Sequence, residues 1–250
     1  MIEMGIVPKR MRPRMCRTLM EIEMKLSPAR ERVPVLEGIE LLNRGKVRDS
    51  YALNDGKMLV VATDAISIFD IVLNALVPEK GVILNAMSHF WLTDIEATLH
   101  VRTHLMAAGA AIDEHVPVHL WGNPQLQARA MVVRRLKMTD VEFIGRGYLT
   151  GSGLKSYNET GLVCGHHLSP GLQDGDQLPA MIATPTTKAQ EGHDEALNAA
   201  AIRERYPEET RLLLEIYGVV HDVAHRNGIV LADTKLEFGR DEAGKVILAD

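Results

Sequence analysis

The sequence predicts an α+β fold whose sheet is largely antiparallel. Short apolar segments separated by turn residues follow one another from Ile39 to Val77, helical periodicity appears only later, and two strand-like segments around a turn close the chain. Regular alternation of strands with helices would indicate a parallel sheet instead, and the sequence lacks it. With 250 residues, of which 46% are hydrophobic, the chain can form one large domain or two small ones.

The first 26 residues have a distinct composition. Basic residues are concentrated between Lys9 and Arg17, and methionine recurs throughout the segment. A transit peptide would be richer in serine and would lack acidic residues such as Glu21 and Glu23. We therefore expect residues 1–26 to be a disordered basic extension, or to follow from a start assigned too early, rather than to be a targeting arm.

Residues 27–135 are expected to form a β-rich N-terminal domain. Strands are predicted in "ELLNRGKVRDSYAL", "MLVVAT" and "ISIFDIVL". A tight turn at Asn54–Lys57 should join the first two, because Asp-Gly tolerates positive φ. A helix should follow, since apolar residues recur at helical spacing and form one stripe. The stripe comprises Ile83, Met87, Phe90, Trp91 and Ile95.

Residues 136–250 are expected to form a second, α+β domain. A strand in "ARAMVVRRLKM" leads into it, and a glycine-rich stretch runs from Gly145 to Gly171. Residues 194–227 should form two helices, because Pro207 interrupts the first and suits the first turn of the second.

The last segment, "LADTKLEFGRDEAGKVILAD", predicts a hairpin with its turn at Asp241–Gly244. Such a hairpin sets Arg240 opposite Lys245 and Lys235 opposite Asp250. Three carboxylates and one ammonium should then alternate onto a single face, a poor core but a good place to hold a hard cation beside a phosphate. The residues of this face are Asp233, Lys235, Glu237 and Asp250.

Two stretches combine glycine with cations. In "NRGKVRDSY" the amides around Gly45, with Lys46 and Arg48, suit a polyphosphate, although a short turn with solvated cations is the commoner origin of such a pattern. In "FIGRGYLTGSGLKSYNETG" the glycines around Arg146 and Ser152 favour recognition of a phosphate or carboxylate over a merely long loop.

Two further stretches allow a structural and a functional interpretation alike. "VVATDAISIFD" sets Asp64 and Ser67 beyond an apolar strand, where loops carry function but acids also cap the next element. In "ATPTTKAQEGHDEAL", Lys188 suits the steering of an acidic substrate and is equally explained as a solvated lysine. Asp194 in the same stretch suits a helix cap.

Composition and spacing argue against several classes of protein. A net charge of −5 gives no electrostatic footprint for nucleic acid, and no apolar run approaches the roughly 20 residues that span a bilayer. Cys16 and Cys164 form neither a disulfide framework nor a zinc pattern, so we expect free thiols in a reducing, cytoplasmic setting. Histidine pairs with helix-face spacing lack a third ligand, so we expect no zinc site. These pairs are His100/His104, His115/His119 and His221/His225.

Five motifs occur in order: "GKVRD", "ATDAISIFD", "RGYLTGSG", "TPTTKAQEGHDE" and "DTKLEFG". Together they resemble the SAICAR synthases (phosphoribosylaminoimidazole-succinocarboxamide synthases) of purine biosynthesis, over about Leu41 to Asp250. The resemblance implies a ligase that uses ATP and Mg²⁺ to join L-aspartate to the carboxylate of carboxyaminoimidazole ribonucleotide through an acyl phosphate. It also implies a small nucleotide-binding domain, a larger substrate domain, and an ATP cleft between them.

The resemblance further implies roles for the residues that match the family's motifs. Those near the reacting groups are Lys235, Lys188 and Asp194. Those that bind ATP are Lys46, Arg48 and Arg135, the last in a hinge strand, residues 131–138, whose backbone would recognise adenine. Those that bind the substrate are Arg146, Ser152, Asp64 and Ser67. Those that hold Mg²⁺ are Glu237 and Asp250.

Two departures from the family's pattern bear on activity. Ala65 stands where the family commonly has arginine, and the family continues beyond the equivalent of Asp250 with a segment of the "TPDSSR" type. Part of the substrate domain is therefore expected to be missing, and the chain as given is expected to bind ATP weakly and to turn over slowly. A catalytically impaired nucleotide-binding remnant and a kinase-like phosphotransferase remain the alternatives. Small molecules are the expected partners, with no nucleic acid and no membrane.

Overall fold

The computed structural model describes residues 35–68, 71–188 and 195–250. These residues form two compact units, one ending at Leu136 and the other running from Lys137 to Asp250, which we call the first and the second unit. All strand pairings within the described residues are antiparallel, which confirms the predicted α+β class. The extension expected over residues 1–26 lies outside the described residues.

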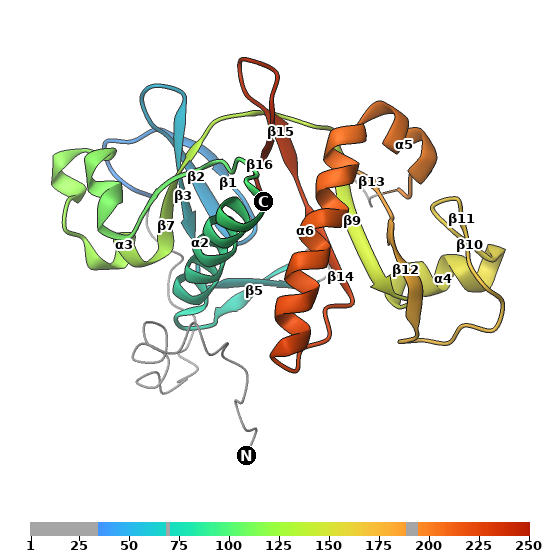
Figure 1. Ribbon diagram of the computed structural model, residues 1–250. Helices are drawn as coiled ribbons and strands as arrows, with labels where there is room; N and C mark the ends of the chain where they lie inside the picture. The colour runs from blue at the N-terminus through green and yellow to red at the C-terminus, as the bar shows by residue number, and fades with distance from the viewer. Residues whose placement is uncertain (1–34, 69–70, 189–194) are drawn as a thin grey trace. The chain divides into compact units, whose positions relative to one another are not determined.

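The first unit is built on a five-stranded sheet with the order β1-β2-β3-β7-β6 (Figure 1). Asp55 and Gly56 both have positive φ, at 58° and 66°, so the tight turn predicted between β2 and β3 is confirmed. The buried side chains of Tyr51, Leu59 and Val132 belong to the core on one face of this sheet. The strands are β1 (Leu41–Arg44), β2 (Arg48–Ala52), β3 (Lys57–Ala62), β6 (Leu105–Ala108) and β7 (Ala130–Arg134).

Helix α2 (Lys80–Leu99) contacts β3, β6 and β7 and confirms the predicted helix, but only Ile95 of the predicted stripe is fully buried. The side chains it buries belong to Asn85, Leu92 and Ile95, whereas Met87, in the predicted stripe, is exposed. The helix approaches β3 so closely that a Cβ on Gly81 would lie 2.5 Å from the carbonyl oxygen of Ala62. The buried face of α2 therefore depends on Gly81, a small residue that apolar periodicity does not detect.

Three short helical segments of the first unit were not predicted. Asn123 accepts hydrogen bonds from the amides of Gln125 and Leu126 and thereby caps the one α-helix among them. The segments are η1 (Gly109–Glu114), η2 (Val118–Leu120) and α3 (Pro124–Arg129).

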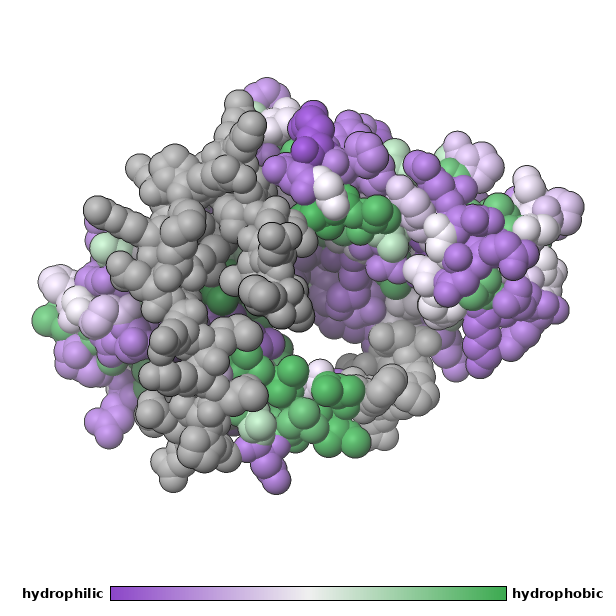
Figure 2. All heavy atoms as spheres, turned by 90° about the horizontal axis from the view of Figure 1, so that it is seen from below, coloured by the Kyte–Doolittle hydropathy of each residue, from purple (hydrophilic) through white to green (hydrophobic). Residues whose placement is uncertain are grey.

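A separate two-stranded hairpin, β4 (Ala65–Ile68) and β5 (Ile71–Leu76), completes the first unit. Its large apolar side chains are unusually exposed, Ile71 to 67%. Figure 2 shows apolar surface gathered on one face of the molecule among polar surroundings.

The second unit is organised around β9 (Val141–Tyr148). β14 (Asp233–Leu236) pairs with one edge of β9, while β12 (Gln177–Ala183) and β13 (Thr186–Thr187) pair with the other. Helix α6 (Pro207–Arg226) contacts β9, β12 and β14 and covers this sheet (Figure 1). The other elements are β8 (Lys137–Met138), α4 (Gly151–Thr160), β10 (Leu162–Val163), β11 (His166–His167), α5 (Ala199–Arg205), β15 (Phe238–Arg240) and β16 (Val246–Leu248).

The two helices predicted between residues 194 and 227 are confirmed as α5 and α6. Asn198, rather than Asp194, is the residue that caps α5, since its Oδ1 accepts from the amides of Ala200 and Ala201. Helix α4, in contrast, was not predicted, and it lies within the glycine-rich stretch from Gly145 to Gly171.

The closing hairpin is confirmed, but the predicted register was wrong by one residue. Arg240 lies opposite Val246 rather than Lys245, because Asp241 Oδ1 accepts hydrogen bonds from the amides of Ala243 and Lys245 and lengthens the turn. The predicted pairing of Lys235 with the end of the chain was also wrong, because β14 pairs with β9 instead.

Tyr217 of α6 explains why β9 carries glycine at two alternate positions. A Cβ on Gly147 would lie 2.5 Å from the Tyr217 hydroxyl oxygen, and one on Gly145 would lie 3.3 Å from Tyr217 Cβ. The same hydroxyl donates to the carbonyl oxygen of Leu231 at 2.7 Å, and burial raises the pKa of Tyr217 to about 12. These two glycines therefore serve helix packing rather than ligand approach.

Gly147→Ala is expected to destabilise the protein by about 1–3 kcal/mol, because the added methyl group overpacks the contact with Tyr217. The loss of stability should be smaller in a Tyr217→Phe background, because the hydroxyl oxygen that the added methyl group would contact first is absent. Urea unfolding of the two single variants and the double variant measures this coupling. Gly218→Ala is the matched control, since its Cβ would meet only Met181 Cε at 3.5 Å and should not destabilise. Additive costs in the double variant would contradict the packing role.

Candidate functional site

Four charged side chains meet on one side of the β9 sheet, and we call them the charged cluster: Glu142, Lys188, Lys235 and Glu237. Lys235 Nζ lies 2.6 Å from Glu142 Oε1 and 3.0 Å from Glu237 Oε1. Lys188 Nζ forms an ion pair with the other oxygen of Glu237. Positive and negative charges thus alternate along the cluster, and each lysine contacts Glu237.

Strand pairing brings the cluster together from distant parts of the chain. Lys235 lies opposite Ile144 in the β14–β9 register, so its side chain reaches Glu142 diagonally, two residues along β9. Lys188 arrives from the other edge of β9, because Thr187 of β13 pairs with Val141 and the Lys188 amide donates to the Asp140 carbonyl oxygen at 3.3 Å.

The contacts shift the pKa values of Lys235 and Glu237. Burial lowers the pKa of Lys235, but Glu142 and Glu237 raise it by more, so it lies above its ordinary value of 10.5. Burial raises the pKa of Glu237, but Lys188 and Lys235 lower it by more, so it lies below its ordinary value of 4.5. At neutral pH Glu237 is therefore a carboxylate and Lys235 an ammonium group, a fixed cation rather than a base.

Arg146 is a buried cation on β9 that is only partly satisfied. The residue is 4% exposed, and its Nη1 lies 2.8 Å from Asp233 Oδ2 and 3.1 Å from the Thr150 carbonyl oxygen. Its Nε is buried without a hydrogen-bond partner among the described residues. A Cβ on Gly153 would lie 3.2 Å from that Nε, so this glycine makes room for the guanidinium. Ser152 is the exposed second residue of α4, which starts beside Arg146.

Asp64 has a structural role in the first unit. Its Oδ1 accepts from the Gly81 amide at 2.9 Å, in the first turn of α2, and from Arg129 Nη1 at 3.2 Å. The capping interpretation of this acid is therefore supported by its contacts. Ser67 lies in β4 opposite Val72, and the side chain of Ala65 is buried.

The residues expected to bind ATP lie on the first unit. Gly45 forms a tight turn between β1 and β2, in which its amide donates to the Arg48 carbonyl oxygen at 2.8 Å and its own Cβ would lie 2.9 Å from that oxygen. This turn carries an exposed Lys46, with Arg48 at the start of β2. Arg135 is exposed beyond β7, and its amide donates to the Gly56 carbonyl oxygen at 2.8 Å.

The two acids expected to hold Mg²⁺ lie side by side. The Glu237 amide donates to the Asp250 carbonyl oxygen at 2.8 Å, and the Ala249 amide donates to the Glu237 carbonyl oxygen at 2.9 Å. No group of three or more histidine, cysteine or acidic residues suited to a metal occurs within residues 35–68, 71–188 and 195–250. Glu237 instead has two lysines as its partners.

Asp194, which the resemblance places near the reacting groups, lies outside the described residues. Of the histidine pairs, His221 and His225 share a face of α6, with ring centroids 6.0 Å apart, whereas His100 follows the end of α2.

Sequence reasoning missed two acids of the site, Glu142 and Asp233 as the partner of Arg146. Glu142, Ile144 and Arg146 are two residues apart along β9, so their side chains lie on the same face of the strand. Recognition of β9 as a strand would therefore have placed Glu142 beside Arg146. Asp233 lies opposite Arg146 in the β14–β9 register, which only the fold reveals.

The stability of the second unit is expected to fall at acid pH through Glu237. Because its folded pKa is depressed, the stabilisation is complete above about pH 4.5 and is lost as the pH falls through the folded pKa. Glu237→Gln should be less stable than the parent chain at neutral pH and should lose less stability on acidification. Urea unfolding between about pH 7 and pH 3 measures the difference. Glu242→Gln, in the exposed terminal turn, is the control, and identical acid profiles for parent and Glu237→Gln would contradict the assignment.

No helix within the part of the chain that the structure describes is long and apolar enough to cross a membrane.

Comparisons with known proteins agree on one family. The profile of the SAICAR synthetase family matches residues 41–250. The phosphoribosylaminoimidazole-succinocarboxamide synthase of Rhodococcus jostii is 44% identical over 87% of this chain and 72% of its own length. The corresponding synthase of Thermodesulfovibrio yellowstonii is 42% identical over 86% of this chain and 73% of its own length.

Solved structures give the same result. The SAICAR synthase from Saccharomyces cerevisiae, in complex with SAICAR, is 37% identical and superposes with a TM-score of 0.76 over 86% of this chain and 74% of its own. A type-2 SAICAR synthetase in complex with ADP, at 22% identity, shares the fold with a TM-score of 0.64 over 83% of this chain and 78% of its own. The resemblance recognised in five ordered motifs is thus confirmed, and the chain belongs to the SAICAR synthetase family.

Proposed function

We propose that this chain is an ATP-dependent ligase that joins L-aspartate to the carboxylate of carboxyaminoimidazole ribonucleotide, in the cytoplasm. The observation that carries the proposal is the family match over residues 41–250, which includes every residue of the charged cluster. The related yeast enzyme was solved with SAICAR, the product of this reaction.

The reaction requires the neutralisation of negative charge. An oxygen of the ribonucleotide carboxylate attacks the γ-phosphorus of ATP, and the bond from that phosphorus to the β,γ-bridging oxygen breaks to release ADP. The aspartate amine then attacks the acyl carbon, the bond to phosphate breaks, and the amine loses a proton. Lys188 and Lys235 are suited to this as cations, because both are fixed by Glu237 and the pKa of Lys235 is raised.

Glu142 is proposed as a positioning residue for Lys235. Its carboxylate contacts Lys235 Nζ at 2.6 Å and accepts a hydrogen bond from the Thr186 hydroxyl at 3.4 Å. Glu142 of β9 and Thr186 of β13 therefore fix the position of the Lys235 ammonium together. A phosphate that replaces Glu237 at Lys235 would leave the contact between Lys235 and Glu142 intact. The Lys235 ammonium would then keep its position while one of its two carboxylate partners is exchanged for the phosphate.

Arg146 and Ser152 are proposed to bind the ribonucleotide phosphate. Arg146 cannot turn away, because Asp233 and the Thr150 carbonyl hold Nη1, and its buried Nε still lacks an acceptor. Such a fixed and under-satisfied guanidinium favours an anion with several oxygens. Lys46, Arg48 and Arg135 are proposed to contact ATP, with Ser67 near the substrate.

The donors at Glu237 and Asp250 fit a magnesium ion. Mg²⁺ is usually held by one or two carboxylates together with substrate phosphates, and these two residues are joined through their backbones. The ion would supply neutralisation of the ATP phosphates. Asp194 is proposed, on its motif alone, to lie near the reacting groups.

Lys235→Met is expected to lower kcat about 10²- to 10³-fold, as removal of one charge stabiliser of a transition state does. Incubation with ATP, Mg²⁺, aspartate and the ribonucleotide, with product followed by absorbance, measures this. Lys245→Met, in the exposed terminal turn, should leave the rate unchanged. ATP consumption that does not require aspartate would indicate the phosphotransferase instead, and ATP binding without any turnover would indicate the remnant.

Arg146→Ala is expected to weaken ribonucleotide binding about 10- to 150-fold, since a charge-assisted hydrogen bond contributes roughly 1.5–3 kcal/mol. ATP affinity should change little. Calorimetric titration with each ligand separates the two effects, and Arg211→Ala, whose guanidinium pairs with Glu215 on exposed α6 surface, is the control. Equal losses for both ligands would show that Arg146 is purely structural.

A further inference from the structure

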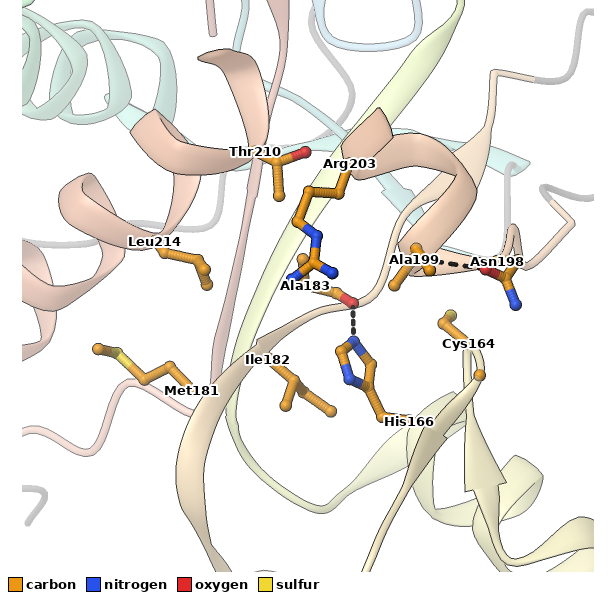
Figure 3. A pocket seen from close by; sticks show the side chains of 12 residues that line it. Cys164, His166, Met181, Ile182, Ala183, Asn198, Ala199, Arg203, Thr210 and Leu214 are labelled. Carbon is orange, nitrogen blue, oxygen red and sulfur yellow. Dashed lines mark hydrogen bonds between the residues drawn. The ribbon is translucent and has the colours of Figure 1, made fainter. Parts of the chain in front are cut away.

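A cavity of about 370 Å³ lies in the second unit, away from the charged cluster. Its walls come from α5, α6, β12 and the β10–β11 hairpin, and Figure 3 shows their side chains. Met181, Ile182 and Leu214 make one side apolar, and no acidic residue lines it among the described residues. None of its lining residues belongs to the charged cluster or forms an ion pair with Arg146, although Ile182 lies opposite Arg146 in the β12–β9 register.

One cation enters this cavity. Arg203 extends from α5 toward Ala183, as Figure 3 shows, and its guanidinium makes no hydrogen bond or ion pair with any described residue. Arg205, two residues later on the same short helix, differs, since it pairs with Asp140 at 3.3 Å and lies over the Tyr206 ring. Helix α5 therefore directs one arginine to a protein partner and the other into the cavity.

A second polar group of the cavity lacks a partner. Thr210 is 5% exposed, and its Oγ1 is buried without a hydrogen bond among the described residues. A buried hydroxyl of this kind is costly unless something accepts its proton, and a rotation of the Thr210 side chain about χ1 would bring it to an acceptor in the cavity. His166 lines the cavity too, with its Nε2 held 2.9 Å from the Ala183 carbonyl oxygen.

From these observations we propose that the cavity binds a small aliphatic carboxylate, separately from the ligase site. The planar fork of Arg203 matches two carboxylate oxygens, Thr210 supplies a further donor, and Met181, Ile182 and Leu214 receive the aliphatic part. A phosphate fits less well, because it has no apolar part to pack against Met181, Ile182 and Leu214. The ligand would contact elements that lead into β13 and Lys188, since the Leu197 amide ahead of α5 donates to the Pro185 carbonyl oxygen at 2.9 Å.

Cys164 provides a reporter inside the cavity. It lines the wall, is a free thiol and is half-buried. In a Cys16→Ser background it is the one thiol left, because the chain has 2 cysteines. The rate of its alkylation by neutral iodoacetamide should fall as butyrate is added, while butyramide, the uncharged isostere, should give little protection. No ATP or aspartate is present, so the outcome is independent of the ligase proposal.

Three variants locate the effect. Arg203→Met should weaken protection by butyrate about tenfold or more, whereas Arg205→Met should leave it unchanged. Thr210→Val should also weaken protection, yet should raise the unfolding temperature without ligand, because it removes a hydroxyl that lacks a partner. Equal protection by butyrate and butyramide, stronger protection by inorganic phosphate than by butyrate, or protection that survives Arg203→Met would each overturn the proposal.

Discussion

The close approach of helix α6 to strand β9 is the constraint on which the second unit depends. Tyr217 fills the space that side chains at Gly145 and Gly147 would occupy, and its hydroxyl reaches across to the Leu231 carbonyl at the start of the segment leading into β14. One aromatic residue thereby fixes the helix on β9 and the approach of β14 beside it. The register of β14 in turn sets Asp233 against Arg146 and Lys235 near Glu142. A packing contact on one face of the sheet thus determines the placement of charge at the site.

Opposite charges are balanced within the charged cluster. Glu142 and Glu237 offset Lys188 and Lys235, and the depressed pKa of Glu237 shows that its two lysines outweigh the cost of burying its charge. Such a cluster can accept anions by exchange of partners, because a phosphate oxygen can replace a carboxylate oxygen at an ammonium without a new buried charge. Glu237, once released, has a carboxylate available for a cation that accompanies the phosphate. The ion pairs of the cluster are therefore compatible with the proposed binding of ATP and magnesium.

Local rules predicted local features of this fold, and contacts between distant segments lay beyond them. The Asp-Gly turn, the break at Pro207 and the terminal hairpin follow from the conformations of single residues, and all three are present. The partner of β14 could not be predicted, because β9 lies about ninety residues earlier and alternation does not identify a partner. Most of the buried face of α2 was missed for a related reason, since Gly81 is buried through close backbone approach and Asn85 through hydrogen bonds to Ala128 and Ala130. Among site residues, motifs identified Arg146, Lys188 and Lys235, whereas their acidic partners required the sheet register.

A buried ion pair connects this packing to the acids proposed to hold the metal. Glu209 of α6 is 0% exposed, and its Oε1 lies 2.6 Å from Arg240 Nη2, while its Oε2 has no hydrogen-bond partner among the described residues. A pair of this kind contributes little net stability, but loss of Arg240 would leave the buried charge of Glu209 uncompensated. The ion pair therefore serves to position the β15–β16 hairpin. Arg240 ends β15, β15 begins next to Glu237, and the Glu237 backbone pairs with that of Asp250. Helix α6 consequently holds β9 through Tyr217 at its middle and the β15–β16 hairpin through Glu209 near its start, so that the two edges of the proposed site share a single rigid support.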